Sequence, residues 1–210
     1  MHVHSAYSLL AGTMKIPTLI AAAKADKQPA INIADTDNLF GALEFAELAV
    51  ENGIQPIVGA SFAIDFAGEH SIPSQDDKHV NEKKRIVLIA ATADGWQNLM
   101  KLISNIYVNN SNNGPIAIGL RELEDSNSGL IVLSGGISGP IDDCLTRGQI
   151  LLARQRLQQL KVIFGNRLYV EIQRYERATD SYDETLLLEL ADDIDLDIVC
   201  LLYTSPSPRD

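Results

Sequence analysis

Two histidines separated by one residue, His2-Val3-His4, open the chain, and histidine is the side chain that most often binds metals in proteins. We interpret this stretch as a β-strand, in which residues i and i+2 point to the same face, so both imidazoles could share one ion. Two ligands do not hold a catalytic metal, because such a site needs at least three protein ligands and an ordered second shell. The pattern predicts a metal site only if later segments supply more ligands.

Polar or small residues stand at or just past the ends of several apolar runs along the chain. Beyond His2 and His4, these positions are Asp35, Ser61, Gly136 and Tyr175. If the apolar runs are strands of one sheet or barrel, their C-terminal ends meet at one edge, where ligands of such folds gather. We therefore expect any functional site of this chain to lie at that edge.

Short apolar runs alternate with helical patterns along most of the length. The expected strands cover residues 30–34, 55–66, 85–90, 130–133, 168–172 and 197–200. The expected helices cover residues 39–52, 96–108, 149–164 and 184–193. Repeated strand-then-helix units predict an α/β fold with a parallel sheet or barrel and helices outside. Residues 67–84 and 109–115 are polar and are expected to be loops.

The composition limits the classes of function. The chain has 210 residues and a formal net charge of −11, with 28 acidic against 17 basic residues, which disfavours a surface that follows nucleic-acid phosphates. No apolar run reaches the roughly 18 residues of a membrane span, and the first residues lack a signal-peptide pattern, so we expect a cytoplasmic protein. Cys144 and Cys200 have no metal-binding spacing and are expected to be reduced.

Six stretches carry a resemblance when they are taken in order. They cover residues 4–10 (HSAYSLL), 35–45 (DTDNLFGALEF), 53–59 (GIQPIVG), 95–102 (GWQNLMKL), 129–139 (GLIVLSGGISG) and 164–174 (FGNRLYVEIQR). The ordered set resembles the PHP (polymerase and histidinol phosphatase) domain at the N-terminus of bacterial replicative polymerases, the DNA polymerase III alpha subunits. The second stretch is most similar to alphaproteobacterial members. The resemblance covers nearly everything from residue 1 to about residue 199.

The resemblance implies a distorted TIM-like (β/α)7 barrel, the PHP fold, which we expect to be incomplete at both ends here. In members that keep the full site, ligands from several strand ends hold a cluster of metal ions. That cluster hydrolyses a phosphodiester as a 3′–5′ exonuclease, because bridged ions activate a water and neutralise phosphate charge. We expect this domain over residues 1–200, with a polar excursion near residues 67–84. Residues 201–210 have the Pro/Ser composition of a disordered tail or a non-native junction.

Carried over residue by residue, the family's ligand set is only partly present. His2, His4 and Asp35 match ligand positions of the family. The degenerate positions, where metal-bearing members have other residues, are Thr36, Ser61, Arg85, Gly136 and Tyr175. Hydroxyl groups do not supply the charge that binds a divalent cation tightly, and an arginine adds a fixed positive charge. We therefore expect His2, His4 and Asp35 to be vestigial ligands, with residual binding of Zn or Mn as the alternative.

The residues named above also have simpler, structural interpretations. His2 and His4 could be a hydrogen-bonded pair in a polar barrel mouth, and Asp35 could hold a loop or cap the following helix. Histidines in the polar excursion (His70 and His79) are expected to be solvated. The same holds for the acid pairs Asp142-Asp143 and Asp192-Asp193, which lie in helical stretches.

The expected function is that of a non-catalytic PHP domain, and no catalytic residue is assigned. The resemblance implies that the domain scaffolds the remaining polymerase domains of the same subunit and docks a separate proofreading exonuclease subunit. It also implies that Mg-dependent nucleotidyl transfer belongs to polymerase domains beyond this region, so DNA would be met only through the whole replicase. The alternative is an active metal-dependent phosphoesterase or 3′–5′ exonuclease with an altered ligand set. A free-standing phosphatase of the histidinol-phosphate type is disfavoured by the polymerase-like stretch at residues 38–41.

Overall fold

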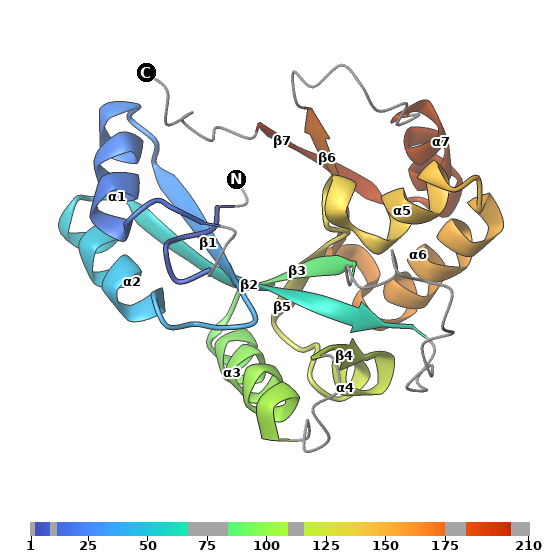
Figure 1. The fold of residues 1–210 in the computed structure, drawn as a ribbon, viewed down its shortest axis with the longest axis horizontal. Coiled ribbons are helices and arrows are strands. Elements are labelled where there is room, and N and C mark those ends of the chain that lie inside the picture. Colours follow the sequence, from blue (N-terminus) through green and yellow to red (C-terminus); the bar gives the residue numbers. More distant parts are fainter. Residues whose placement is uncertain (1–2, 9–11, 67–83, 109–115, 175–183, 203–210) are drawn as a thin grey trace.

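A computed structural model describes residues 3–8, 12–66, 84–108, 116–174 and 184–202 (Figure 1). Within these residues a strongly twisted sheet runs through the centre of the molecule, and helices cover its outer side. In Figure 1, α1 and α2 lie on the left against the first strands, whereas α5, α6 and α7 lie on the right. The mixed α/β architecture predicted from the sequence is confirmed.

The sheet contains six strands in the order β1-β2-β3-β5-β6-β7 and a short seventh strand, β4, that pairs with the end of β2. The bounds are β1 Ala30–Thr36, β2 Gln55–Asp65, β3 Arg85–Ala90, β4 Ile118–Gly119, β5 Leu130–Leu133, β6 Leu168–Arg174 and β7 Asp197–Leu202. The six predicted strands are therefore present, three of them within one residue of the expected bounds.

One strand runs against its neighbours, which corrects the expectation of a parallel sheet. The β1–β2 pair is parallel, and β5, β6 and β7 are parallel to one another. In contrast, β3 is antiparallel to both β2 and β5. The apolar run Arg85–Ala90 predicts a buried strand but carries no information on direction, because its pattern is the same in either orientation. As a result, the start of β3 and the C-terminal ends of its neighbours share one edge.

Seven α-helices lie among the described residues. They are α1 Ile16–Ala25, α2 Ala42–Glu51, α3 Ala93–Val108, α4 Leu120–Asp125, α5 Pro140–Thr146, α6 Ile150–Phe164 and α7 Glu184–Ile194. The four predicted helices are confirmed, although α2 begins three residues later than expected. The sequence interpretation did not predict α1, although proline at its first turn and a buried face at helical spacing are typical of a helix start.

The two faces of the sheet bury different kinds of core. One face packs against the helices, with Phe62, Leu88 and Phe164 among the fully buried side chains of the larger cluster. A smaller cluster joins α1 and α2 to β1. The opposite face carries a cluster made only of strand residues, in which Ala34 and Val87 pack together with Leu133. Among the described residues, this face of the curled sheet is therefore lined by apolar side chains.

The described start of the chain departs from the prediction. Val3 and His4 do not form a strand, although the amide of Ala34 donates a hydrogen bond to the Val3 carbonyl oxygen (2.8 Å). A turn begins at Ala6, so the described part of this segment leaves the edge of β1 there. His2, Tyr175, His70, His79, the expected loops at residues 67–83 and 109–115 and the tail at 203–210 lie outside the described residues. None of the described helices is long and apolar enough to cross a bilayer.

Candidate functional site

The candidate site is the mouth of the curled sheet, defined here as the edge at which β1, β2, β5 and β6 end and β3 begins. Thr36 at the end of β1 is the register partner of Ser61 on β2. Ser61 is in turn opposite Val87 on β3, so Arg85 stands two residues further out on the same face. The register thus brings together three of the degenerate positions predicted from the sequence.

Asp35 is buried at the mouth and is fully engaged by the turn that precedes α1. Its Oδ1 accepts hydrogen bonds from the Ser5 amide (2.7 Å) and the Ser8 hydroxyl (2.5 Å), and its Oδ2 accepts one from the Ser5 hydroxyl (2.7 Å). The Ser8 hydroxyl also accepts a hydrogen bond from the Thr36 amide (3.0 Å). The geometry corresponds to the simpler expectation for Asp35, in which its carboxylate holds a loop.

His4 lies beside this turn. Its Nδ1 is 3.4 Å from the hydroxyl of Ser8, which links the imidazole to Asp35 through one serine. On the other side of the turn, the Tyr7 hydroxyl donates to the Glu44 carboxylate on α2 (3.1 Å). That hydrogen bond, together with the negative charge of Glu44, raises the pKa of Tyr7. The turn is therefore fastened both to β1 and to α2.

Arg85 occupies the middle of the mouth. Its Nε donates to the Ser61 hydroxyl (3.0 Å), and its Nη2 donates to the Ser61 carbonyl oxygen (2.5 Å) and to Asp37 Oδ1 (2.5 Å). The Tyr107 hydroxyl on α3 donates to the Asp37 carbonyl oxygen (2.9 Å). Burial raises the pKa of Tyr107, and Asp37 raises it further, whereas Arg85 lowers it.

The far side of the mouth is formed by the segment after β5 and by β6. Gly136 has a positive φ, and a Cβ built there would lie 2.7 Å from the Gln173 side chain. The Gln173 amide donates to the carboxylate of Glu171, a residue that is fully buried. The Glu171 amide donates to the Ser134 hydroxyl (2.9 Å). A larger residue at position 136 would therefore collide with Gln173.

Sequence reasoning missed several residues of the mouth. Asp37, Tyr107 and Glu171 were not singled out, although each makes a contact there. Glu171 could have been found, because an acid between the apolar residues of a strand is unusual. Asp142 was expected to be solvated, but it is 2% exposed, so that expectation was wrong. The first turn of α5 turns its side chain inward, while Asp143 pairs with Lys84 (3.1 Å).

The donors of the mouth that lie among the described residues do not by themselves fit a bridged metal cluster. Within the described part of the chain, no three His, Cys, Asp or Glu side chains are placed so that they could hold an ion. The Asp35 carboxylate is used by three protein donors, Thr36 and Ser61 are neutral, and Arg85 brings a permanent positive charge. A divalent cation here would meet a guanidinium in place of an imidazole or carboxylate.

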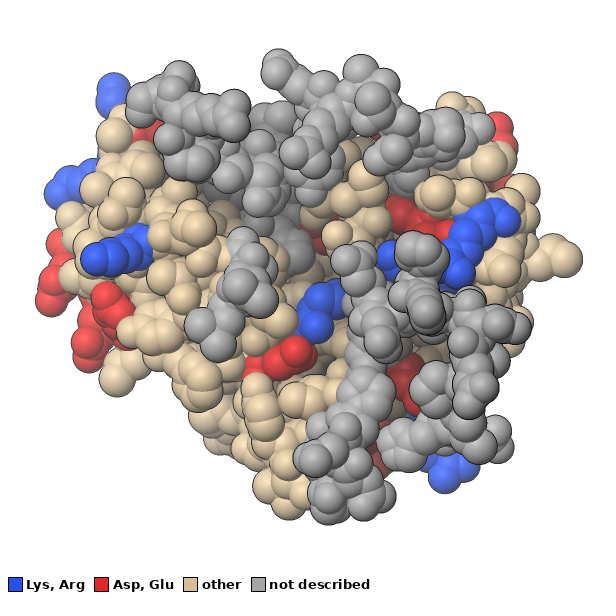
Figure 2. Space-filling view, viewed as in Figure 1, with Lys and Arg blue, Asp and Glu red and all other residues tan. Residues whose placement is uncertain are grey.

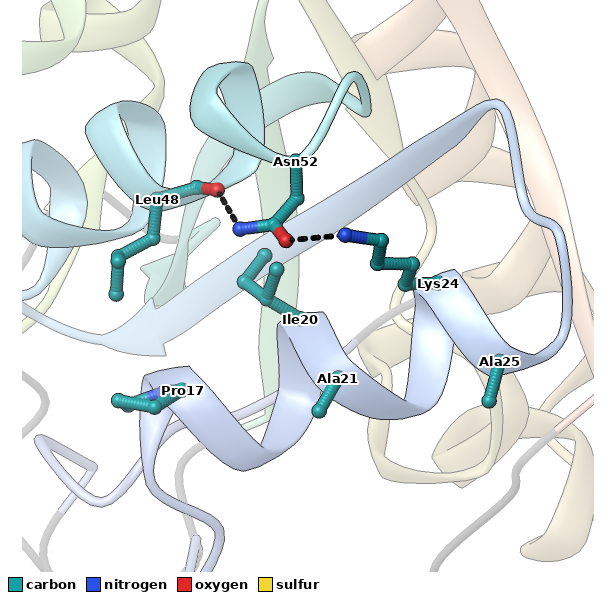
Figure 3. A pocket seen from close by; sticks show the side chains of 7 residues that line it. All are labelled: Pro17, Ile20, Ala21, Lys24, Ala25, Leu48 and Asn52. Carbon is teal, nitrogen blue, oxygen red and sulfur yellow. Dashed lines mark hydrogen bonds between the residues drawn. The ribbon is translucent and has the colours of Figure 1, made fainter.

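A shallow pocket lies elsewhere, between α1 and α2 (Figure 3). It has a volume of about 430 Å³ and is lined by Pro17, Ile20, Ala21, Lys24, Ala25, Leu48 and Asn52. At its rim, Lys24 Nζ donates to the side-chain oxygen of Asn52 (3.0 Å), which Figure 3 shows bridging the two helices. Because Lys24 and Asn52 shortly precede the starts of β1 and β2, this rim is at the opposite edge of the sheet from the mouth.

Comparison with models of known protein families identifies the family of this chain. The family model described as "PHP domain" matches residues 1–175. This chain belongs to the PHP domain family. The resemblance inferred from the six sequence stretches is thereby confirmed.

Curated relatives named DNA polymerase III subunit alpha match almost the whole chain. The relative from Caulobacter vibrioides is 34% identical over 95% of this PHP chain and 17% of its own length. The relative from Rickettsia conorii is 31% identical over 100% of the chain and 17% of its own length. The PHP chain thus spans about one sixth of the length of the curated relatives that it matches.

Solved structures of other proteins share the fold. An amidohydrolase from Chromobacterium violaceum, solved with bound sulfate and no metal, superimposes with a TM-score of 0.59 at 13% identity and covers 98% of this chain and 87% of its own. A protein from Bifidobacterium adolescentis, described as a metal-dependent phosphoesterase, gives a TM-score of 0.51 at 14% identity and covers 95% and 84%. At this level of identity the likeness concerns the fold alone, and it confirms the barrel-type architecture predicted from the sequence.

Proposed function

We propose that this PHP chain acts in DNA replication as a non-catalytic domain of a polymerase of the DNA polymerase III alpha type. The observation that carries the proposal is the Arg85 contact set, in which the guanidinium binds Asp37 and Ser61 at the mouth. The match to alpha subunits along 95% of the chain supplies the context. His2, His4 and Asp35 are then vestigial ligands, and the mouth is a structural feature.

Within such a polymerase, the role that remains is to scaffold the other domains of the same subunit. The relatives extend far beyond the matched region, which covers 17% of the Caulobacter subunit. Nucleotidyl transfer and its Mg ions would belong to the remaining domains, and DNA would be bound there. A bacterial cytoplasmic location follows from this role.

The further partner that we propose is the proofreading exonuclease subunit. The surface of the chain favours a protein over a phosphate backbone, because its net charge is −11. Figure 2 shows basic and acidic side chains interspersed on one face and not gathered into a single basic field. On and just before α2, Phe40, Leu43 and Val50 are 74%, 70% and 65% exposed, and exposed apolar side chains of this size suit contact with protein.

Docking is tested by mixing the purified chain with the proofreading exonuclease subunit of the same replicase and measuring co-elution in size-exclusion chromatography. We expect a 1:1 complex at micromolar concentrations. A double variant, Phe40→Asp/Leu43→Asp, reports whether the apolar residues on and just before α2 contribute, and Val162→Asp on α6, at a side chain that is 84% exposed, is the matched control. Separate elution at 50 µM or so of each protein would refute the docking role.

The second candidate function is a metal-dependent phosphoesterase or 3′–5′ exonuclease with an altered ligand set. One observation favours it: His4 and Asp35 lie in one hydrogen-bonded group around Ser8. It is tested by elemental analysis of protein purified without a histidine tag and by release of the 3′ nucleotide from a labelled primer with Mn²⁺ or Zn²⁺. We expect no stoichiometric metal and no chelator-sensitive release. Two or more ions per chain would replace the first proposal with this one.

A further inference from the structure

At the mouth, one side chain links the start of β3 to β2 and to the segment that follows β1. Arg85 begins β3, and its guanidinium donates to both the backbone and the side chain of Ser61 on β2. The same guanidinium binds Asp37 in the segment between β1 and α2. Because arginine has a planar fork of five donors, it can satisfy several acceptors in fixed directions, as a metal ion does with its ligands.

The partners of Arg85 are themselves fixed. Asp37 has a positive φ of 55°, an uncommon conformation for a residue other than glycine, which needs support from its surroundings. That support comes from three contacts: the Asp37 amide donates to the Ser61 carbonyl oxygen (3.0 Å), its carbonyl accepts from Tyr107, and its carboxylate accepts from Arg85. Arg85 and α3 therefore both fix the loop at Asp37, Arg85 through the carboxylate and Tyr107 of α3 through the carbonyl oxygen.

The backbone of Arg85 packs closely against the segment that follows β5. Gly135, two residues after the end of β5, approaches so closely that a Cβ there would lie 1.9 Å from the Arg85 carbonyl oxygen. One step inward on the same face of β3, Val87 packs with Ala34 and Leu133 in the inner apolar cluster. The guanidinium thus links the end of β1 to β2, the backbone of Arg85 packs against the segment after β5, and Val87 continues the same face of β3 into the apolar cluster.

We propose that the Arg85 guanidinium is a built-in cation that replaces a metal ion as the structural centre of the mouth. Its charge is permanent and covalently attached, so a chelator cannot remove it. A divalent cation cannot bind beside it without meeting like-charge repulsion. This inference concerns the stability of the mouth and holds whether or not the chain docks an exonuclease subunit.

The test is a pair of double-mutant cycles measured by thermal unfolding of the whole chain. The first cycle uses Arg85→Met, Asp37→Asn and their combination. The chain offers a matched control in the neighbouring ion pair of Lys84 and Asp143, whose side chains are 28% and 18% exposed, against 24% and 17% for Arg85 and Asp37. The control cycle uses Lys84→Met, Asp143→Asn and their combination.

We expect Arg85→Met to lower the melting temperature by about 6 °C and Lys84→Met by less than about 2 °C, because the guanidinium also holds β2. The combined Arg85/Asp37 variant should lose clearly less than the sum of its two single variants. Arg85→Lys keeps the charge but not the fork and should lie between wild type and Arg85→Met, so the comparison survives if Arg85→Met does not fold. Equal decreases in melting temperature in the Arg85/Asp37 and the Lys84/Asp143 cycles would overturn the proposal.

A second measurement addresses the cation directly. Melting of the wild-type chain is compared in 1 mM or so MnCl2 and in EDTA, with Lys84→Met treated in the same way. The proposal predicts that neither addition moves the melting temperature of either protein by more than about 1 °C. A rise of several degrees with Mn²⁺ in the wild type would show that the mouth accepts an ion and would overturn the proposal.

Discussion

Asp35 illustrates how a carboxylate in a ligand position can be occupied by donors of its own chain. It is 2% exposed, and its two oxygens accept hydrogen bonds from both serines of the turn at residues 5–8. Hydrogen bonds to an ionised acceptor are stronger than those between neutral groups. The residue therefore stabilises the start of the chain, whatever its ancestral role in the family.

Replacing Asp35 should destabilise the fold strongly. Asp35→Ala leaves the Ser5 amide and two hydroxyls without their acceptor, and we expect a loss of about 3 kcal/mol in the free energy of unfolding. Asp35→Asn keeps the shape and part of the bonding and should lose about 1 kcal/mol. Urea unfolding measures both. Asp192→Ala, at an exposed acid on α7, is the control and should change stability by less than about 0.5 kcal/mol. A loss below 1 kcal/mol or so for Asp35→Ala would contradict the assigned role.

The two cysteines should differ sharply in reactivity. Burial raises the pKa of the Cys144 thiol, while the charge of Arg156 partly opposes this, and the side chain is 1% exposed. A raised pKa means less thiolate at a given pH, so Cys144 should react with a disulfide reagent at pH 8 only after unfolding. Cys200 is exposed and should react quickly. Absorbance should therefore show one fast thiol per folded chain, and Cys200→Ser should remove it. Two fast thiols would contradict the burial of Cys144.

At the level of residues, the sequence indicated several positions that lie in the mouth, but it did not indicate the hydrogen-bond partners of their side chains. The family resemblance named Ser61 and Arg85 as two degenerate positions of one ligand set, and in the structure their side chains are in contact. Asp37 was not predicted, because an ion pair between residues 37 and 85 leaves no local signal in one sequence. The roles of His2 as a vestigial ligand and of Tyr175 as a degenerate ligand position stay predictions, since both residues lie outside the described part of the chain.

The connection after β5 shows how an element depends on one glycine. Gly135 has a φ of +92° and faces the Arg85 carbonyl oxygen with no room for a side chain. Gly148 has a φ of +70° but nothing within 4 Å of a built Cβ. The two glycines allow the cost of backbone strain to be separated from the cost of a steric clash. A side chain would be strained at both positions because φ is positive, but it would also collide with a neighbouring atom at Gly135.

Gly148→Ala should therefore lower the free energy of unfolding by about 1 kcal/mol, the usual cost of alanine at positive φ. Gly135→Ala should lower it by about 3 kcal/mol or more, because β3 or β5 must also move. Chemical unfolding of the two variants under identical conditions measures the difference. Similar values for the two glycines would mean that the contact between β5 and Arg85 is looser than described.

Most elements could be predicted from the sequence, whereas the direction of β3 and the helices α1 and α4 were not. Apolar runs located all six long strands, since burial on both faces requires them. The direction of β3 could not be predicted, because the pattern of a buried run is symmetrical. The helix α4, with six residues, is too short for its periodicity to be recognised. The strand expected around His4 was wrong, because the chain turns away from β1 at Ala6.

At the scale of the whole molecule, the charge predicts how the chain behaves toward DNA. With a net charge of −11 and a sequence pI near 4.7, the chain repels a polyanion over its surface as a whole. We expect no saturable binding of a fluorescent primer–template below about 100 µM protein at about 0.15 M salt, measured by anisotropy. A dissociation constant below 10 µM or so would show a local binding site that the net charge conceals and would argue against a purely scaffolding role.

The reversed strand β3 has a consequence for engineering. Because β2 leaves the sheet at the mouth and β3 enters it there, Asp65 and Lys84 are attachment points on the same rim. The connection between β2 and β3 starts and ends at the same rim and does not have to cross the sheet. Its length can therefore change without altering how β2 and β3 pair. Each doubling of such a loop costs only about 0.6 kcal/mol in closure entropy. A fluorescent reporter inserted between these two residues would therefore be displayed over the mouth, with both hairpin strands left in place.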